Sequence, residues 1–209
     1  MVADGAACQD WLLEELLGWA PLVMALDQAL FRLEEKGIRV DCWLGDFDGI
    51  ANPHAYVAHN HPHIEVIHTP DQNATDFQKG IRYLAGRGYL QVHVAWATGR
   101  RMDHTFDNLC STARLARELD IGITLYDDHG AIYPVRPGFR KWYPKDTIIS
   151  LLPVGQVNNL TTNNLHYPLN SESLATDQRL GSSNVVEADG EVRLDFDVGG
   201  LLLIMESND

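Results

Sequence analysis

The stretch Val40-Asp41-Cys42-Trp43-Leu44-Gly45-Asp46-Phe47-Asp48 joins a mostly apolar run to a pair of aspartates. Its apolar run predicts a buried strand that ends at the glycine, and two aspartates follow at once. Two more polar stretches, Asp71-Gln72-Asn73-Ala74-Thr75-Asp76 and Thr98-Gly99-Arg100-Arg101-Met102-Asp103-His104, also follow runs typical of strands. Since ligands of an open α/β sheet bind beyond the carboxyl ends of its strands, we expect the three stretches to meet at one edge.

Strands and helices alternate through the first part of the chain. Apolar runs predict strands at 22–26, 40–44, 64–68, 90–96 and 121–126. Amphipathic patterns, caps and a stop at Gly37 predict helices at 10–20, 29–36, 76–85 and 103–119. Such alternation indicates a mostly parallel sheet with helices on its faces.

The pattern changes after about residue 128, where short apolar runs are separated by turn residues. The runs lie at 132–135, 147–152, 185–186, 192–196 and 201–205, and Asp189-Gly190 between two of them predicts a hairpin. We therefore predict an α/β domain over residues 1–130 and an all-β sandwich domain over residues 131–209.

Composition narrows the class of protein. The chain has 209 residues, a hydrophobic fraction of 45% and a net charge of −13 without any basic stripe, which argues against a nucleic-acid partner. The sequence holds neither the charged and apolar regions of a signal peptide nor an apolar run near the ~20 residues of a membrane helix. Three scattered cysteines, Cys8, Cys42 and Cys110, are typical of reduced thiols in a cytoplasmic protein.

The first two polar stretches carry carboxylates suited to a hard cation. Asp46 and Asp48 lie two residues apart, so both can approach one Mg²⁺ that keeps substrate phosphates as further ligands. Asp71 and Asp76 are available for a metal or a substrate cation, and the helix N-terminus predicted at Asp76 favours an anion. Read separately, the first stretch also fits a surface turn, and the second a capped loop.

The third polar stretch adds positive charge. Arg100 and Arg101 can reach phosphate oxygens, and Asp103 and His104 open the next helix. Its alternative interpretation is a helix cap with solvated arginines. His59, His61 and His63 alternate as a zinc site on a strand would require, but Asn60 and Pro62 favour a solvated loop.

The three stretches together resemble the motifs of thiamine pyrophosphokinases, in order and with suitable spacing. Gly181-Ser182-Ser183-Asn184 resembles the Ser-Asn element of that family's β domain, so the resemblance covers most of the chain. It implies a nucleotide-binding catalytic α/β domain, a thiamine-binding and dimerisation β-sandwich, and a homodimer with active sites between subunits. The implied reaction moves pyrophosphate from ATP to the thiamine hydroxyl, giving thiamine diphosphate and AMP with Mg²⁺ as cofactor.

Residue roles follow from the same resemblance. Catalysis would fall to Asp46, Asp48, Asp76 and Arg101, and Mg²⁺ binding to Asp46, Asp48, Asp71 and Asp76. The nucleotide side would be contacted by Asp71, Asn73, Thr98, Asp103 and His104. The thiamine side would be formed by Gln72, Asp76, Ser182, Ser183 and Asn184.

The chain departs from this family at three places. The family usually carries Asp-Gly-Gly where Asp27-Gln28-Ala29 stand, often Ser at Gly49, and Gly at Arg100. Two alternatives stay open: a pyrophosphokinase or nucleotide-dependent transferase for another small alcohol, and a thiamine- or nucleotide-binding protein without turnover. The missing glycines after Asp27 point to the second.

Overall fold

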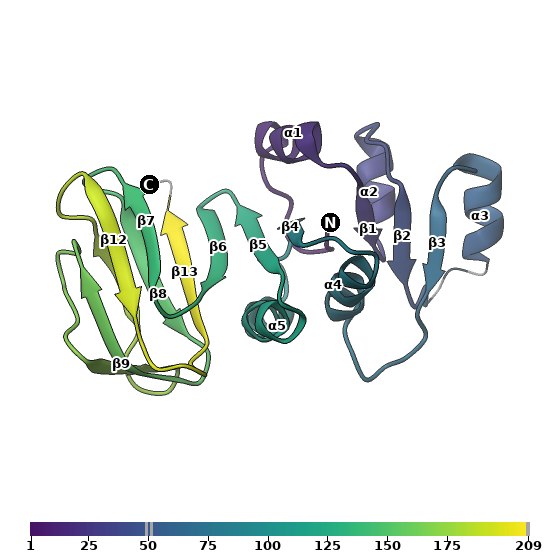
Figure 1. The fold of residues 1–209 in the computed structure, drawn as a ribbon. Helices are drawn as coiled ribbons and strands as arrows, with labels where there is room; N and C mark the ends of the chain where they lie inside the picture. Colours follow the sequence, from purple (N-terminus) through teal and green to yellow (C-terminus); the bar gives the residue numbers. More distant parts are fainter. Residues whose placement is uncertain (49, 51, 208–209) are drawn as a thin grey trace.

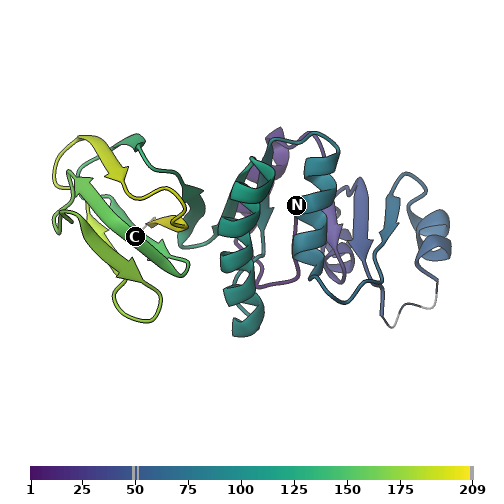
Figure 2. The same cartoon turned by 60° about the horizontal axis from the view of Figure 1, so that its bottom comes forward.

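A computed structural model describes residues 1–48, 50 and 52–207, so the Gly49 departure lies outside the described residues. The chain forms an α/β part and an all-β part that lie side by side (Figures 1 and 2). In the α/β part the helices are α1 (Asp10–Trp19), α2 (Ala29–Glu35), α3 (Pro53–Asn60), α4 (Asp76–Gly86) and α5 (Met102–Leu119). Its strands are β1 (Met24–Leu26), β2 (Cys42–Gly45), β3 (Glu65–His68), β4 (Gln91–Ala95) and β5 (Gly122–Asp127).

Parallel pairing builds the sheet of the α/β part. Strands β1, β2 and β3 pair in that order, and β4 pairs with β5. Val2 joins the two groups, because it forms parallel bridges to Ala25 of β1 and Ala95 of β4. The predicted alternation and the mostly parallel sheet are therefore confirmed.

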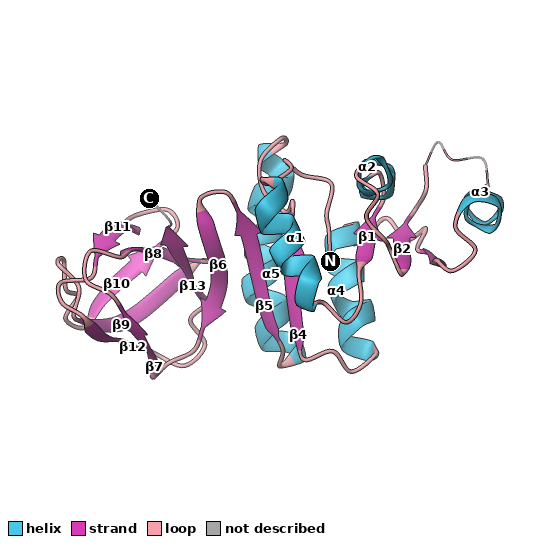
Figure 3. Ribbon diagram, turned by 90° about the horizontal axis from the view of Figure 1, so that it is seen from above, coloured by secondary structure: helices cyan, strands magenta, loops and turns pink. Residues whose placement is uncertain are grey.

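Helices cover both faces of this sheet (Figure 3). Side chains of a strand point alternately to opposite faces, so Met24 and Leu26 pack in one core and Ala25 packs in the other. The first core contains α4 and α5, and the second contains α1, α2 and α3. Burial on both faces explains why β1 and β2 are apolar at every position but the glycine.

The all-β part is a sandwich, as predicted. Its strands are β6 (Gly130–Val135), β7 (Phe139–Tyr143), β8 (Ile148–Pro153), β9 (Gln156–Asn163), β10 (Glu172–Ala175), β11 (Gly181–Val185), β12 (Gly190–Asp195) and β13 (Leu202–Ser207). A sheet of order β10-β9-β12-β7 packs on the neighbouring strands β11-β8-β13-β6. Leu151 and Ile204 from the second sheet share a core with Leu160 and Leu194 from the first.

The second sheet does not stop at the all-β part. Strand β6 pairs antiparallel with β5, so one six-stranded sheet runs β11-β8-β13-β6-β5-β4 (Figure 3). The turn between β5 and β6 falls close to residue 130, where the sequence placed the domain boundary; that boundary stays a prediction.

Two local predictions were wrong. Strand β12 pairs with β7 and β9 rather than with β11, so Asp189-Gly190 does not close a hairpin. The segment around the histidines is partly helical, because Asn52 caps α3 by accepting from the Ala55 amide and Pro53 starts the helix. His59 therefore lies on α3, while His61 and His63 follow its end.

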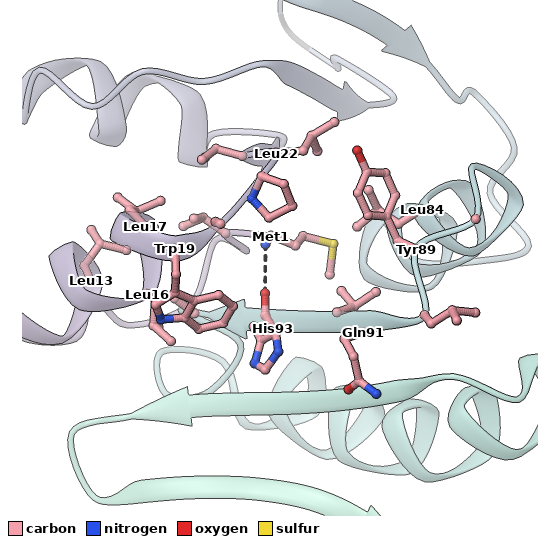
Figure 4. Close-up of a pocket in the computed structure, with 18 residues that line it drawn as sticks. Met1, Leu13, Leu16, Leu17, Trp19, Leu22, Leu84, Tyr89, Gln91 and His93 are labelled. Atoms are coloured by element: carbon pink, nitrogen blue, oxygen red, sulfur yellow. Dashed lines mark hydrogen bonds between the residues drawn. The ribbon is translucent and has the colours of Figure 1, made fainter.

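An apolar pocket of about 370 Å³ opens between β1 and β4 at their amino ends (Figure 4). Leu13, Leu16 and Leu17 of α1 line it, with Trp19 edge-on to His93 at 4.5 Å between ring centroids. It lies at the opposite end of these strands from the polar stretches. None of the helices in the described part of the chain combines the length and apolar character that crossing a membrane requires.

Candidate functional site

A polar cleft of about 660 Å³ lies at the carboxyl ends of β1, β2 and β4. Its walls include the segments that follow these strands and the first turns of α4 and α5. Parallel strands bring such segments to one edge, which is why polar stretches far apart in the sequence meet here. Of the predicted site residues, the cleft brings together Asp46, Gln72, Asn73, Asp76, Arg101 and His104.

Asp46 is held as an ionised carboxylate at the end of β2. It accepts hydrogen bonds from Gln72 Nε2 at 3.0 Å and from the Asp48 amide at 3.2 Å, and these bonds lower its pKa. Phe47 turns the chain with φ of 59° and buries its ring 4.4 Å from that of Trp43. The turn therefore leaves Asp46 beside the cleft and Asp48 exposed to solvent, outside the cleft wall.

Asp76 is the first residue of α4, and its surroundings disfavour the charged form of its carboxyl group. Thr75 caps the helix by accepting from the Gln78 amide at 3.4 Å. Burial raises the pKa of Asp76, the hydrogen bond from Lys79 at 3.2 Å opposes this, and the charge of Asp46 adds to the rise. A raised pKa makes this carboxylate a stronger base than an exposed aspartate.

Asp27 is a further carboxylate of the cleft, and the sequence analysis did not assign it a role. Burial raises its pKa, and the charges of Asp76 and Asp46 raise it further. The residue has a left-handed φ of 43°, which aspartate tolerates better than most side chains. Its position directly after a strand, as for Asp46, was the signal that could have identified it.

The missing glycines after Asp27 leave no strain in the backbone. Gln28 has an ordinary φ of −68° and points to solvent, while Ala29 is fully buried at the start of α2. The side chains therefore fit a regular helix start.

The third polar stretch, residues 98–104, is held in place by close packing and by hydrogen bonds. Gly99 has φ of 71°, and a Cβ there would lie 2.6 Å from Cβ of Ala6, so only glycine fits. Thr98 donates to Asp127 at 2.8 Å. Asp103 accepts from Arg101 Nε at 3.1 Å and from the His104 amide, and the arginine lowers the Asp103 pKa to about 2.

Several predicted residues do not reach the cleft wall. Asp71 is exposed and closes a turn by accepting from the Asn73 amide at 3.0 Å. Among the described residues, the cleft lining also omits Asp48, Thr98 and Asp103, which lie in segments that border it.

Ser182, Ser183 and Asn184 lie on β11, the far edge of the six-stranded sheet from β4. Asn184 is buried and accepts from the Tyr167 amide at 3.0 Å, while its own amide donates to the Tyr167 carbonyl at 2.8 Å. Ser182 and Ser183 are exposed. Within one chain, therefore, these three residues do not join the cleft.

Negative charge dominates the cleft. It is lined by five carboxylates (Asp4, Asp27, Asp46, Asp76 and Asp107) and by three cationic side chains (Lys79, Arg100 and Arg101). Lys79, three residues after Asp76, and Asp107, which accepts from Gln78 at 3.1 Å, were missed by the sequence analysis. A polyphosphate would meet repulsion here unless a divalent cation came with it.

The donor set fits Mg²⁺ of the kind that keeps waters and phosphates among its ligands. Carboxylate oxygens are the ligands this ion prefers, and one or two suffice when substrate phosphates supply others. Within residues 1–48, 50 and 52–207, no three histidine, cysteine or acidic side chains gather closely enough to hold a metal by themselves. The cleft is therefore suited to a cation bound together with its substrate.

Two family models match the chain. The model for "Thiamin pyrophosphokinase, catalytic domain" matches residues 13–125, and the one for "Thiamin pyrophosphokinase, vitamin B1 binding domain" matches residues 139–201. The first match contains Asp27, Asp46 and Asp76, and the second contains the β11 residues.

Solved structures of thiamine pyrophosphokinases share the fold of this chain. Thiamine pyrophosphokinase from Bacillus subtilis is 24% identical, with a TM-score of 0.77 over 100% of this chain and 97% of that chain. The Candida albicans protein is 14% identical, with a TM-score of 0.83 over 99% of this chain and 88% of that one. The yeast protein is 15% identical, with a TM-score of 0.81 over 99% and 84%.

Proposed function

Because the chain belongs to the thiamin pyrophosphokinase family, we propose that it transfers pyrophosphate from ATP to thiamine in the cleft at the carboxyl ends of β1, β2 and β4. In this reaction the thiamine hydroxyl oxygen bonds to the β-phosphorus, the bond from that phosphorus to the α–β bridging oxygen breaks, and AMP leaves. The observation that carries the proposal is the carboxylate-rich cleft to which all three motifs contribute, most of whose lining lies within the catalytic-domain match.

Mg²⁺ would be held by Asp46 and Asp48, with Asp71 from the bordering turn, and Asp76 would stay free of the ion. Bound there, the ion would neutralise phosphate charge as ATP enters a negative cleft. Asp46 suits this task because its hydrogen bonds keep it ionised. The proposal for Asp48 and Asp71 requires their exposed turns to move toward the bound phosphates.

Side chains of the chain would do the remaining work by placing groups and moving one proton. Arg101 would bind the transferring phosphates, with Asn73, Thr98, Asp103 and His104 holding the nucleotide side. Asp76, with its raised pKa, would accept the proton of the thiamine hydroxyl. Gln72 would contact thiamine from the cleft.

The thiamine side requires a second subunit in this proposal. Ser182, Ser183 and Asn184 lie on β11, far along the sheet from the cleft. A homodimer would bring the β11 edge of one subunit to the cleft of its partner, which completes the site without changing the fold. The direct check is the mass of the protein in solution, by light scattering.

The deciding experiment measures AMP release from ATP and Mg²⁺, with and without thiamine, together with mass detection of thiamine diphosphate. Thiamine-dependent AMP with matching product supports the proposal. AMP release without thiamine dependence points to another small alcohol as acceptor. Ligand binding without any AMP would contradict the enzymatic assignment.

An Asp46→Asn variant tests the site itself. We expect kcat to fall by about 100-fold or more, because a carboxylate ligand of the Mg²⁺ that neutralises the phosphates is lost while the shape is kept. Asp177→Asn is the matched control, since Asp177 is an exposed turn residue of the all-β part. Equal turnover in the Asp46 variant and this control would remove Asp46 from the mechanism.

A further inference from the structure

Arg100 lines the cleft in a backbone conformation that an arginine rarely adopts. Its φ is 54°, in the left-handed region that favours glycine. Such a conformation is strained for a residue other than glycine and persists where the surroundings impose it. The surroundings of Arg100 therefore hold a charged side chain at the cleft wall in spite of this strain.

The side chain of Arg100 is bound to Asp4. Its Nη1 donates to Asp4 Oδ1 at 3.1 Å and to the Asp4 carbonyl at 3.1 Å. The same Oδ1 atom also accepts from Arg32 Nη1 at 3.0 Å. One carboxylate oxygen thus serves two arginines.

Of these two arginines, Arg32 is the fixed one. It also donates to the Gly5 carbonyl at 2.8 Å, and its guanidinium lies 4.2 Å from the centroid of the Trp96 ring. Its side chain is 28% exposed, whereas that of Arg100 is 56% exposed. If Arg100 left, Asp4 would remain paired with Arg32, so no carboxylate would lose its counter-charge.

Each of the other two cations of the cleft, Lys79 and Arg101, is paired with a carboxylate that has no second lysine or arginine bonded to it among the described residues. Lys79 is nearly buried and bonds both Asp76 at 3.2 Å and the Thr69 carbonyl at 2.8 Å. Arg101 forms a two-point pair with Asp103, which matches the planar fork of its guanidinium. Arg100 is therefore the cleft cation that can leave its carboxylate without depriving it of a cationic partner, because Asp4 keeps Arg32.

We propose that Arg100 is a phosphate-binding residue held in reserve by Asp4, from which it transfers to the polyphosphate of the nucleotide when the ligand enters the cleft. Asp4 is a positioning residue, and it competes with the ligand for Arg100 while Arg32 keeps it neutralised. This inference rests on the proposed function. It names a contact that this chain makes where the family usually has glycine.

Arg100→Gly is the variant of choice, because glycine suits the observed φ and the fold should be retained. Isothermal titration would measure its affinity for ATP with Mg²⁺ and for inorganic triphosphate with Mg²⁺. We expect both to weaken about tenfold, the effect of one charge-assisted bond, with no loss of thermal stability. Arg136→Gln is the control: it removes an arginine of similar exposure, paired with Asp120 and remote from the cleft.

Asp4→Asn tests the competition. Removing the carboxylate should tighten ATP binding about twofold to threefold in the wild-type background and leave it unchanged in the Arg100→Gly background. A purely structural role for Asp4 would move stability but would not depend on Arg100. Equal or tighter ATP binding by Arg100→Gly, or an Asp4 effect that persists in that background, overturns the inference.

The outcome is separable from the fate of the proposed function. Wild-type protein that binds triphosphate through Arg100 but forms no thiamine diphosphate leaves this inference standing and removes the proposed reaction. Wild-type protein that forms product, with unchanged triphosphate affinity in Arg100→Gly, does the reverse. Protein that binds neither ATP nor triphosphate contradicts both.

Discussion

At the scale of single residues, the cleft concentrates negative charge that nothing in the free protein fully offsets. Asp27 is the clearest case, because burial and the charges of Asp76 and Asp46 all raise its pKa. A carboxyl group whose pKa is raised by folding stabilises the folded state at low pH, where it is protonated. That contribution is lost as the pH rises through its folded-state pKa.

An Asp27→Asn variant should therefore stabilise the ligand-free protein at neutral pH. Asparagine keeps the shape and tolerates the left-handed φ of 43°. We expect a gain of roughly 0.5–2 kcal/mol in the free energy of unfolding, the usual size of a favourable charge change, because one of several mutually repelling carboxylates is removed. Urea titrations at several pH values would measure it.

The sign of the pH dependence is the control for Asp27→Asn. The gain should shrink as the pH is lowered through the raised pKa of Asp27, because the wild-type carboxyl then carries a proton too. A gain independent of pH, or a loss of stability at neutral pH, would contradict the charge argument.

At the scale of elements, the sequence predicted the α/β part well. The two patterns that mark it, apolar runs for strands and capping residues for helices, both involve residues that are close in the sequence. Strands β1 and β2 are short apolar runs, and Thr75 marks the start of α4 as the capping pattern requires. The polar segments that follow these strands met in one cleft because parallel topology brings them together. Asp4 could not be predicted in this way, because it enters the site through the bridges of Val2.

The all-β part was less predictable because its strands carry irregularities. Strand β9 was missed because its Asn158-Asn159 pair looks like a turn, and Asn159 indeed has φ of 53° and interrupts the alternation of buried positions. Strand β7 carries Arg140 and Lys141 at the edge of its sheet. Long-range pairing, which no local pattern encodes, decided that β12 lies between β7 and β9.

The side chain of Asn184 on β11 is hydrogen-bonded to the backbone of Tyr167, so its substitution should affect stability first. Asn184→Ala would leave the Tyr167 amide and carbonyl without their side-chain partner in a buried site. We expect a loss of about 2–3 kcal/mol in the free energy of unfolding. Ser182→Ala, at an exposed position on the same strand, is the control and should change stability by less than about 0.5 kcal/mol.

A different result would give Asn184 its predicted role as a direct thiamine ligand. In that case Asn184→Ala would weaken thiamine binding while leaving the urea midpoint unchanged. The structure favours the indirect role, because both ends of the side-chain amide are already engaged with Tyr167.

At the scale of the whole molecule, β13 couples the two parts of the chain. Leu203 packs in the core that contains α4 and α5, whereas Leu202 and Ile204 pack in the sandwich core. Its neighbour β6 extends the same sheet to β5. This one strand therefore contributes side chains both to a core of the α/β part and to the core of the sandwich.

We therefore expect both parts to unfold in one transition. Tryptophan fluorescence would mainly follow the α/β part, which holds four of the five tryptophans, including the buried Trp43 and Trp96. Hydrogen exchange of peptides from β9 and β12 would follow the all-β part. Coincident guanidinium midpoints would confirm the coupling. Two separated midpoints would mean that the shared sheet breaks between β5 and β6.

The distance along the sheet from the cleft to β11 leads to the last prediction, which concerns two chains at once. If each proposed site lies between two subunits, it combines the cleft of one subunit with β11 of the other. Asp46→Asn then inactivates the cleft half of a site, and a Ser182→Ala/Ser183→Ala double variant inactivates the β11 half. In a mixed dimer, one site combines both defects and the other combines neither. Refolding the two inactive variants together in equal amounts should restore roughly a quarter of wild-type activity, because random pairing makes half the dimers mixed. The control is each variant refolded alone, which should stay inactive. If the mixture of the two variants also stays inactive, the whole site lies within one chain.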